Sequence, residues 1–355
     1  MLEIKNVART VLLMILLVLL QSCENSEENF LAKESKLCKV TFLVTPNGLG
    51  DNGYDDDAAK GVFAFMEESG VPVHLMMPED IEDGEKMYLE WLSENATCDS
   101  AVLIVGSPAY IDILKRTPPK LYGRGSRVML FESAEEIEGV STVMINRYGV
   151  SYLAGAMSNE FDAFILAAAP GYTTLEDAIA GFKDGHKAMG DGSRTVTLQY
   201  LADGEDGFAM PDSAYRTICR RAEGFWYYDE MVFPLLGGSE AGVIKYLNSD
   251  DLNPVLLVGM DVEQTGQSPR IPFSMIIRIG EAIKMNLISW TQGQEWPSTQ
   301  KYGLADGMAD IVITPKFSEN IDIWDERYDD DDAFLRLYNA YYESAIRIEE
   351  EYENK

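Results

Sequence analysis

The sequence predicts an α/β protein with parallel sheets covered by helices on both faces, and two observations lead to this fold class. From residue 39 onward, short apolar runs alternate with segments in which apolar residues recur every three to four positions. The apolar runs, expected to be strands, are 40–44, 71–76, 101–105, 128–131, 143–145, 164–168, 196–200, 231–235 and 255–258. These are too many strands for one compact sheet of this type, so the 355 residues are expected to form two α/β lobes.

Helices are expected between the strands, where the apolar residues follow a helical period. Their ranges are 57–69, 83–94, 108–116, 149–160, 175–189, 212–224, 239–248 and 278–290. A last helix is expected near the C-terminus, because Phe334, Leu337, Tyr341, Ala345 and Ile348 recur at intervals of three or four residues.

About three crossings between the lobes are expected, near residues 146–149, 261–272 and 300–320. They divide the chain into an N-lobe of residues 38–147, to which 272–300 return, and a C-lobe of residues 148–271. The remaining residues, 301–355, are expected to hold the last crossing and the C-terminal helix.

The first residues resemble the leader of a bacterial lipoprotein. Lys5 and Arg9 precede an apolar stretch, 11–20, that is too short to span a bilayer and fits a secretory signal. The stretch ends in Leu20-Gln-Ser-Cys23, which resembles a lipobox. Residues 1–22 are therefore expected to be removed, with Cys23 carrying lipid and 23–37 forming a polar tether to a membrane. The alternative is an ordinary signal peptide followed by a chance cysteine.

The composition excludes one large class of partner. A net charge of −30 makes nucleic acid an unsuitable partner, because phosphate contacts require clustered lysine and arginine. The acidic runs 55–57 and 329–332 lack the ligand spacing and the glycine of an EF-hand loop, so solvated charge or helix capping explains them better. No metal or cofactor is expected.

Two cysteines are candidates for a disulfide, since an exported protein meets an oxidising environment. Cys38 precedes the first strand and Cys98 precedes the third, and in a sheet of order 2-1-3 these strands are parallel neighbours. A Cys38–Cys98 bridge is therefore a geometric hypothesis. Cys219 would remain a free, buried thiol.

The loop after the first strand carries the most informative pattern in the chain. Gly48, Gly50 and Gly53 fit G-x-G-x-x-G, the turn that holds a pyrophosphate in dinucleotide-binding proteins. Aspartates at positions 51 and 55–57 crowd the place where that phosphate would lie. With Tyr54 in the turn, the loop better suits a neutral or cationic ligand that has a flat ring and hydroxyl groups.

Six motifs then occur in the order typical of one family. They are Asp51-Asn-Gly-Tyr-Asp55, Ser151-Tyr-Leu-Ala-Gly-Ala156, Ala180-Gly-Phe-Lys-Asp-Gly185, Val232-Phe-Pro-Leu-Leu-Gly-Gly238, Val258-Gly-Met-Asp261 and Tyr302-Gly-Leu-Ala-Asp-Gly307. In these the chain resembles the basic membrane protein (BMP) family of substrate-binding lipoproteins. The resemblance implies a type I periplasmic binding protein fold, with two Rossmann-like lobes and a ligand cleft between them. It also implies that the protein delivers its ligand to an ABC transporter permease.

In that family the ligand is a nucleoside, and the resemblance assigns roles to residues of this chain. Tyr54 takes the place of the phenylalanine that stacks on the base, and a stacked ring contributes about 1–3 kcal/mol per base. Asp51 and Asp55 would accept hydrogen bonds from the base or the ribose. Asp261 would bind ribose hydroxyls, and Gly237 would let the backbone approach the sugar.

The chain departs from the family pattern at two positions. Asp55 replaces an asparagine, and Ile277 replaces a lysine that reaches the ribose. The second departure puts nucleoside specificity in doubt. Phe208 is a candidate for a second stacking ring, although the sequence around it aligns poorly with the family.

Two other functions are open. One is a cofactor-dependent oxidoreductase that uses the Gly48–Gly53 turn, with Glu79 or Asp80 binding the ribose. The other is a ligand sensor that has the same fold and docks on a signalling partner. The sequence contains none of the common hydrolase or metalloprotease motifs, so a binding protein rather than an enzyme is expected.

Overall fold

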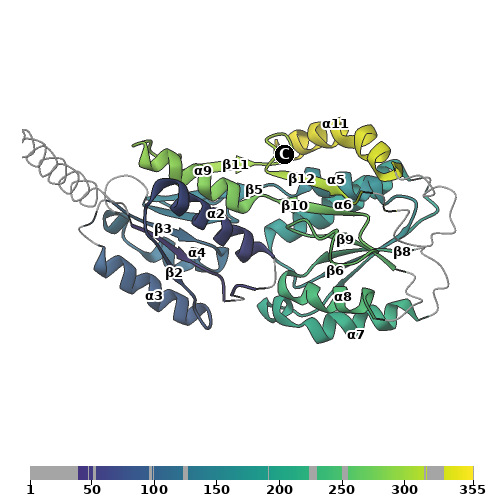
Figure 1. The fold of residues 1–355 in the computed structure, drawn as a ribbon, viewed down its shortest axis with the longest axis horizontal. Coiled ribbons are helices and arrows are strands. Elements are labelled where there is room, and N and C mark those ends of the chain that lie inside the picture. The colour runs from purple at the N-terminus through teal and green to yellow at the C-terminus, as the bar shows by residue number, and fades with distance from the viewer. Residues whose placement is uncertain are drawn as a thin grey trace, which may run out of the picture.

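The computed structural model describes residues 39–46, 48–50, 53–95, 98, 100–122, 127–190, 192–223, 230–249, 255–315, 317 and 332–354. They form two lobes, each built on a six-stranded sheet, that lie side by side in Figure 1. The predicted leader, Cys23, the tether and Cys38 lie outside these residues, as does Asp51.

The N-lobe sheet has the strand order β11-β5-β4-β3-β1-β2, and all of its pairings are parallel. Its strands are β1 (Lys39–Leu43), β2 (Val73–Met76), β3 (Ala101–Val105), β4 (Val128–Phe131), β5 (Val140–Ile145) and β11 (Thr299–Tyr302). One face packs against α2 (Tyr54–Ser69) and α9 (Ile279–Thr291). The other packs against α3 (Ile81–Glu94) and α4 (Ile111–Arg116).

The C-lobe sheet has the order β12-β10-β9-β8-β6-β7, in which only β12 is antiparallel to its neighbour. Its strands are β6 (Asp162–Ala167), β7 (Val196–Tyr200), β8 (Glu230–Leu235), β9 (Val255–Gly259), β10 (Phe273–Ile277) and β12 (Ala309–Ile313). Helices α5 (Tyr148–Met157) and α6 (Thr173–Met189) cover one face. Helices α7 (Pro211–Ala222) and α8 (Glu240–Leu247) cover the other.

The second crossing differs from the expected one. Residues 272–300 were expected in the N-lobe, but β10 lies in the C-lobe sheet between β9 and β12. The chain returns at Arg278, and 279–302 supply α9 and β11 to the N-lobe. The physical reason is that Phe273–Ile277, all buried, complete the C-lobe sheet by pairing with β9 and β12. Strands β10, β11 and β12 were not predicted from the sequence.

Glycines allow the helices of each layer to pack closely. A Cβ on Gly185 of α6 would lie 1.9 Å from the carbonyl oxygen of Tyr152 in α5, and one on Gly155 would lie 2.1 Å from that of Phe182. In the N-lobe, a Cβ on Gly61 of α2 would lie 2.0 Å from the carbonyl oxygen of Gly280 in α9. Two glycines of the family-like motifs, Gly155 and Gly185, are therefore helix-packing residues.

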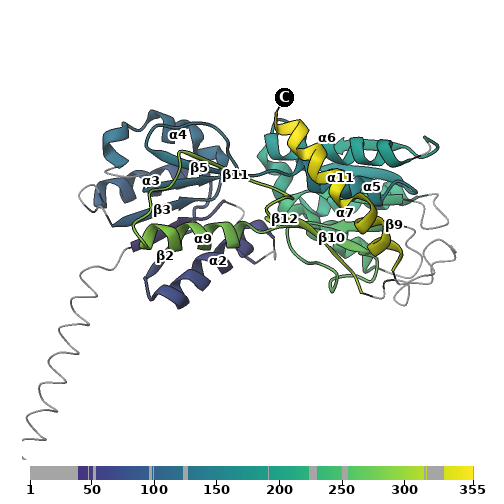
Figure 2. The same ribbon diagram turned by 90° about the horizontal axis from the view of Figure 1, so that it is seen from above.

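The C-terminal helix α11 (Ala333–Glu353) packs on α5 and touches two crossings between the lobes. Figure 2 shows it lying across the C-lobe. The Glu349 carboxylate is buried and accepts hydrogen bonds from the backbone N–H of Gly149, after the first crossing, and of Leu304, in the third (3.0 and 2.8 Å). Asn146, in the first crossing, donates its side-chain N–H to Glu353 (2.8 Å).

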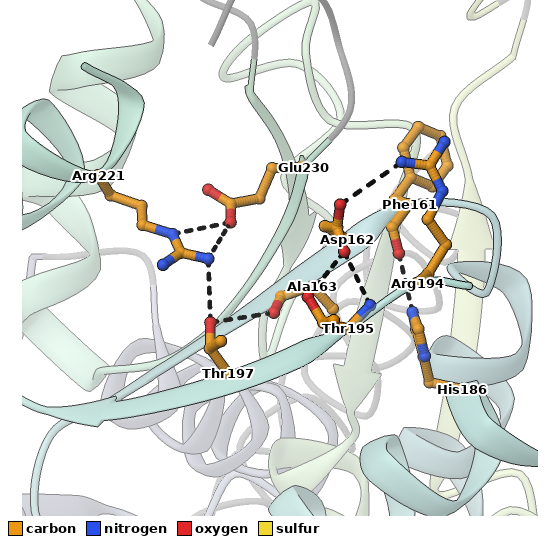
Figure 3. A network of polar contacts seen from close by, with 9 residues as sticks. All are labelled: Phe161, Asp162, Ala163, His186, Arg194, Thr195, Thr197, Arg221 and Glu230. Atoms are coloured by element: carbon orange, nitrogen blue, oxygen red, sulfur yellow. Dashed lines mark hydrogen bonds and ion pairs between the residues drawn. The ribbon is translucent and has the colours of Figure 1, made fainter. Parts of the chain in front are cut away.

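A network of polar contacts joins the amino ends of β6, β7 and β8 in the C-lobe (Figure 3). Arg221 donates two hydrogen bonds to one oxygen of the buried Glu230 (2.8 and 2.6 Å). Asp162 accepts from the backbone N–H of Thr195, and the ring of His186 bonds the carbonyl of Phe161. The members of this network bond one another and the strand ends, so its role is structural.

The cysteine predictions are tested only in part. Strands β2, β1 and β3 are neighbours in the expected order, and Lys39 pairs with Ala101. Cys98 is a free, half-buried thiol in the structure, and its expected partner lies outside the described residues, so the Cys38–Cys98 bridge stays a prediction. Cys219, expected to be buried, is free and half-buried. Among the helices the structure describes, none has the length and apolarity needed to cross a bilayer.

Candidate functional site

A cavity of about 180 Å³ lies between the lobes at the carboxyl ends of their strands. The N-lobe lines it with residues that include Thr45, Tyr54, Asp55, Gly106 and Glu132. The C-lobe lines it with residues that include Tyr172, Glu205, Phe208, Gly237 and Asp261. Arg147, in the first crossing, is the only cation among the lining residues that the structure describes. This is where open α/β sheets bind ligands.

The structure brings together five of the six residues predicted for ligand binding. Tyr54, Asp55, Phe208, Gly237 and Asp261 all line the cavity, although they lie far apart in the chain. Asp51 falls outside the described residues, so its position stays an expectation.

Tyr54 is the first residue of α2, and its ring packs against the core of the lobes. Its hydroxyl is buried and has no hydrogen-bond partner within the part of the chain that the structure describes. Burial, followed by the negative charges of Glu132 and Asp55, raises the Tyr54 pKa well above its usual value. The hydroxyl therefore remains protonated and is able both to donate and to accept a hydrogen bond.

The aspartates that follow Tyr54 hold the loop before α2. Asp55 accepts hydrogen bonds from the backbone N–H of Thr45 (3.3 Å) and from its hydroxyl. Asp56 accepts from the backbone N–H of Gly50 (3.0 Å), and Asp57 from that of Gly280 in α9 (2.9 Å). The expected helix capping is thus replaced by bonds to the loop and to a neighbouring helix.

Glu132, Arg147 and Asp261 form a chain of charges along the cavity wall. The Arg147 guanidinium pairs with one carboxylate oxygen of Glu132, and its other terminal nitrogen lies 4.0 Å from Asp261 Oδ1. Both acids have a left-handed backbone, with φ of 63° at Glu132 and 61° at Asp261. Such φ values strain a residue other than glycine and occur often at ligand sites.

Burial and the neighbouring charges shift the pKa values of Glu132 and Arg147 in opposite directions. Burial raises the Glu132 pKa, and the neighbouring Arg147 only partly offsets the effect. Burial by itself would lower the Arg147 pKa, but the carboxylates of Glu132 and Asp261 outweigh it and raise the pKa above the ordinary value. Arg147 therefore remains charged and holds the two acids in place.

The C-lobe supplies two aromatic rings to the cavity. Tyr172 and Phe208 meet edge to face, with ring centroids 5.1 Å apart and an interplanar angle of 85°. Burial and the nearby Glu205 raise the Tyr172 pKa to about 12. Gly237, with φ of 52°, lies against Phe208, and a Cβ there would come 3.2 Å from that ring. A side chain at position 237 would therefore crowd Phe208 as well as strain the backbone.

A buried side-chain network positions the turn that carries Asp261. The Gln264 amide accepts from the backbone N–H of Met260 (3.1 Å) and donates to Glu240 (2.9 Å). Ile277 donates its backbone N–H to the carbonyl of Asp261 (2.9 Å), while its side chain is buried in the core. The residue that replaces the family's lysine thus supports the turn from behind and is absent from the cavity lining.

The dinucleotide alternative gains no support from this geometry. The backbone N–H of Gly50, which a pyrophosphate would need, is already bonded by Asp56. Across the described ranges, no group of three or more histidine, cysteine, aspartate or glutamate side chains is arranged to hold a metal ion.

Comparison with known proteins identifies the fold. A solute-binding protein of an ABC transporter system from Aeropyrum pernix K1 matches with a TM-score of 0.66 at 16% identity, covering 88% of this chain and 90% of that one. A transcriptional activator of the comK gene from Bacillus halodurans matches with a TM-score of 0.60 at 14% identity, covering 86% and 97%. The fold is that of the periplasmic solute-binding proteins, as the sequence predicted.

A third similar structure carries a ligand. It is an ABC transporter solute-binding protein from Burkholderia graminis in complex with D-arabinose, with a TM-score of 0.56 at 16% identity, covering 78% of this chain and 95% of that one. No family model matches the chain, and no curated protein matches it. At these identities the comparisons show the fold alone, and the resemblance to the BMP family stays a proposal.

Four charged or phenolic residues of the described cavity lining were not predicted from the sequence: Glu132, Arg147, Tyr172 and Glu205. Glu132 directly follows an expected strand, and Arg147 lies within an expected crossing, so their positions gave a usable signal. The left-handed backbone at Glu132 gave none, because glutamate has no preference for that conformation.

Proposed function

We propose that this protein is a lipid-anchored solute-binding protein that closes its two lobes on a small polar molecule. The observation that carries the proposal is the cavity, to which both lobes contribute aromatic rings and carboxylates. A ligand bonded to both walls stabilises the closed arrangement, and closure of this hinge type requires no catalytic group.

A nucleoside is the ligand proposed. The resemblance of the loop around Tyr54 to the BMP family supports it, as does the position of Tyr54 and Phe208 on opposite walls of the cavity. The acids of the lining suit a ligand rich in hydrogen-bond donors, such as one that carries a ribose. Because Ile277 leaves the ribose without a lysine, a free base or a modified nucleoside belongs in the same class.

The proposed partners follow from the same function. The ligand would be handed to an ABC permease, and lipid on Cys23 would hold the protein at a membrane of the bacterial envelope. Replacing Cys23 with serine is expected to move the protein from the membrane fraction to the soluble fraction. A protein that stays in the membrane fraction without Cys23 would contradict the anchor.

A thermal-shift screen of nucleosides, bases and sugars tests the binding function, because a ligand of the native state raises the unfolding midpoint. Calorimetry then measures the best ligand on two variants. Tyr54→Ala is expected to lose about 1–3 kcal/mol of binding free energy through lost stacking, and Asp261→Ala about 1.5–3 kcal/mol.

Two matched substitutions serve as controls. Phe63 lies on the same helix as Tyr54 and is 38% exposed, so Phe63→Ala removes an aromatic ring away from the cavity. Asp212→Ala removes an exposed carboxylate of the C-lobe. Unchanged affinity in both cavity variants would show that the ligand binds elsewhere.

A further inference from the structure

Two polar atoms on the cavity wall are buried without a hydrogen-bond partner. They are the Tyr54 hydroxyl and Oε1 of Glu132, and the absence holds for the part of the chain that the structure describes. The Glu132 side chain is only 9% exposed, and its other oxygen is occupied by Arg147. A buried polar group without a partner destabilises the fold, so two of them at one cavity require an explanation.

The two groups belong to the same cavity and influence each other. The charge of Glu132 is the largest charge effect on the Tyr54 hydroxyl, ahead of that of Asp55. Both residues line the same cavity. Arg147 fixes one oxygen of Glu132, which leaves Oε1 as the oxygen available to another donor.

The chemistry of the pair limits what can satisfy both atoms. Oε1 of an ionised carboxylate only accepts, whereas a phenol both donates and accepts. One ligand group that donates to Glu132 and accepts from Tyr54 must itself be donor and acceptor, which is the property of an alcohol hydroxyl. A carboxylate or phosphate cannot donate and would be repelled by Glu132, and an ammonium cannot accept.

We propose that Tyr54 and Glu132 form a subsite for an alcohol hydroxyl of the ligand, which bridges the phenol and the free carboxylate oxygen. This proposal rests on the proposed solute-binding function and narrows it to uncharged polyols, free or as the sugar of a nucleoside. It gives Tyr54 a polar role in addition to the stacking of its ring, a role that phenylalanine could not fill.

The subsite predicts that a substitution there weakens ligand binding without lowering the stability of the unliganded protein. In the unliganded protein the two atoms bond nothing within the described ranges, so Tyr54→Phe and Glu132→Gln remove no hydrogen bond made by them. The melting temperature without ligand is therefore expected to hold in Tyr54→Phe. Ligand affinity is expected to fall about two- to tenfold in Tyr54→Phe, which loses a hydrogen bond between neutral groups, and about ten- to a hundred-fold in Glu132→Gln, which loses a hydrogen bond to a charged group.

The chain offers two matched controls. The Tyr110 hydroxyl and Oε2 of Glu230 are also buried and unpartnered among the described residues, and neither residue lines the cavity. Glu230 also pairs with an arginine, Arg221, as Glu132 does with Arg147 (Figure 3). Tyr110→Phe and Glu230→Gln are expected to leave affinity unchanged.

The experiment uses the full chain and titrates inosine, adenosine, D-ribose, D-arabinose and their singly deoxygenated analogues by calorimetry. Adenosine 5′-monophosphate and D-arabinonate serve as anionic probes. The best parent polyol is expected to lose affinity when one particular hydroxyl is removed. That loss is expected to shrink in Tyr54→Phe and in Glu132→Gln, because each variant removes one of the two bonds that the hydroxyl makes.

The outcomes distinguish a failure of the Tyr54–Glu132 subsite from a failure of the proposed solute-binding function. If a polyol binds but both variants bind it as the wild type does, the subsite is wrong and the solute-binding function stands. Preference for an anionic probe would also overturn the subsite alone. If no probe binds the wild type, both are overturned. Should Glu132→Gln unfold because Arg147 loses its partner, Tyr54→Phe decides the question by itself.

Discussion

Asp261 combines a strained backbone with a position in the cavity lining. Its φ of 61° lies in the left-handed region, which costs an aspartate energy that glycine would not pay. The bonds to Met260 and to the Asp261 carbonyl hold the turn in this shape from the core side. A strained acid is retained here, although glycine would fit the backbone better.

Asp261→Gly is therefore expected to weaken ligand binding without lowering the stability of the fold. Ligand affinity should fall by about 1.5–3 kcal/mol, the range for hydrogen bonds to a charged group. The unfolding free energy without ligand should not fall, because glycine adopts this backbone without strain. Calorimetry and urea denaturation measure the two quantities. A large loss of stability with unchanged affinity would make Asp261 a structural residue only.

At the residue scale, the sequence predicted several residues that line the cavity but not the contacts between them. Tyr54 and Asp55 could be placed at a cleft because they follow a buried strand and open a helix. Phe208 and Gly237 reach the same cavity through folding of the C-lobe. Glu132 and Arg147 could not be chosen in advance, since their importance depends on burial and on a pairing between residues that precede and follow β5.

At the element scale, several of the motifs that suggested a ligand-binding family turn out to hold helices together. Gly155 and Gly185 let α5 and α6 approach to backbone contact, as Gly61 and Gly280 do for α2 and α9. Such glycines signal a close helix crossing and carry no information about the ligand. The alternation of strands and helices predicted the lobes, whereas the places of β10 to β12 in the two sheets depend on pairings between residues far apart in the chain.

Gly185→Ala is expected to destabilise the C-lobe by about 1–3 kcal/mol, as added volume in a tightly packed contact does. The new methyl group would lie 1.9 Å from a backbone carbonyl oxygen, so the helices must move apart. Gly204→Ala is the matched control, because a Cβ there meets no atom within 4 Å. Thermal denaturation compares them, and equal melting temperatures would mean that the α5–α6 contact tolerates separation.

Glu349 makes the stability contributed by α11 depend on pH. Burial raises its pKa to about 7 from an ordinary 4.5, even though the N–H groups of Leu304 and Gly149 favour the charged form. Glu353 and Asp306 face the same carboxylate and raise the pKa further. Because the folded pKa lies above the unfolded one, the folded protein holds an extra proton between these values. This contribution is complete below the unfolded pKa and is lost as pH rises through the folded pKa.

Glu349→Gln should remove that part of the pH dependence. Between about pH 5 and about pH 8, the wild type is expected to lose up to about 3 kcal/mol more unfolding free energy than the variant. Urea denaturation at both pH values measures the difference. Glu350→Gln, at an exposed position of the same helix, is the control. Parallel pH profiles for wild type and Glu349→Gln would show that Glu349 does not titrate in this range.

At the scale of the whole molecule, direct contacts link the cavity to the segments that cross between the lobes. Arg147 lies in the first crossing and contacts an acid from each lobe, Glu132 and Asp261. On the outer side, α11 bonds the first and third crossings through Glu349 and Glu353. A ligand that bonds both walls is therefore placed next to the segments that must bend when the lobes move.

Ligand-dependent closure is the prediction that belongs to this scale. Small-angle X-ray scattering is expected to give a smaller radius of gyration with a saturating ligand than without it, because bonds to both lobes stabilise the closed arrangement. Tyr54→Ala and Asp261→Ala each remove the contact of one lobe, so either variant should bind more weakly and show less closure at the same ligand concentration. At saturation, Asp212→Ala should close as the wild type does. A ligand that binds tightly without changing the scattering would mean that the two lobes are already fixed, and binding could then not signal occupancy to a permease through closure.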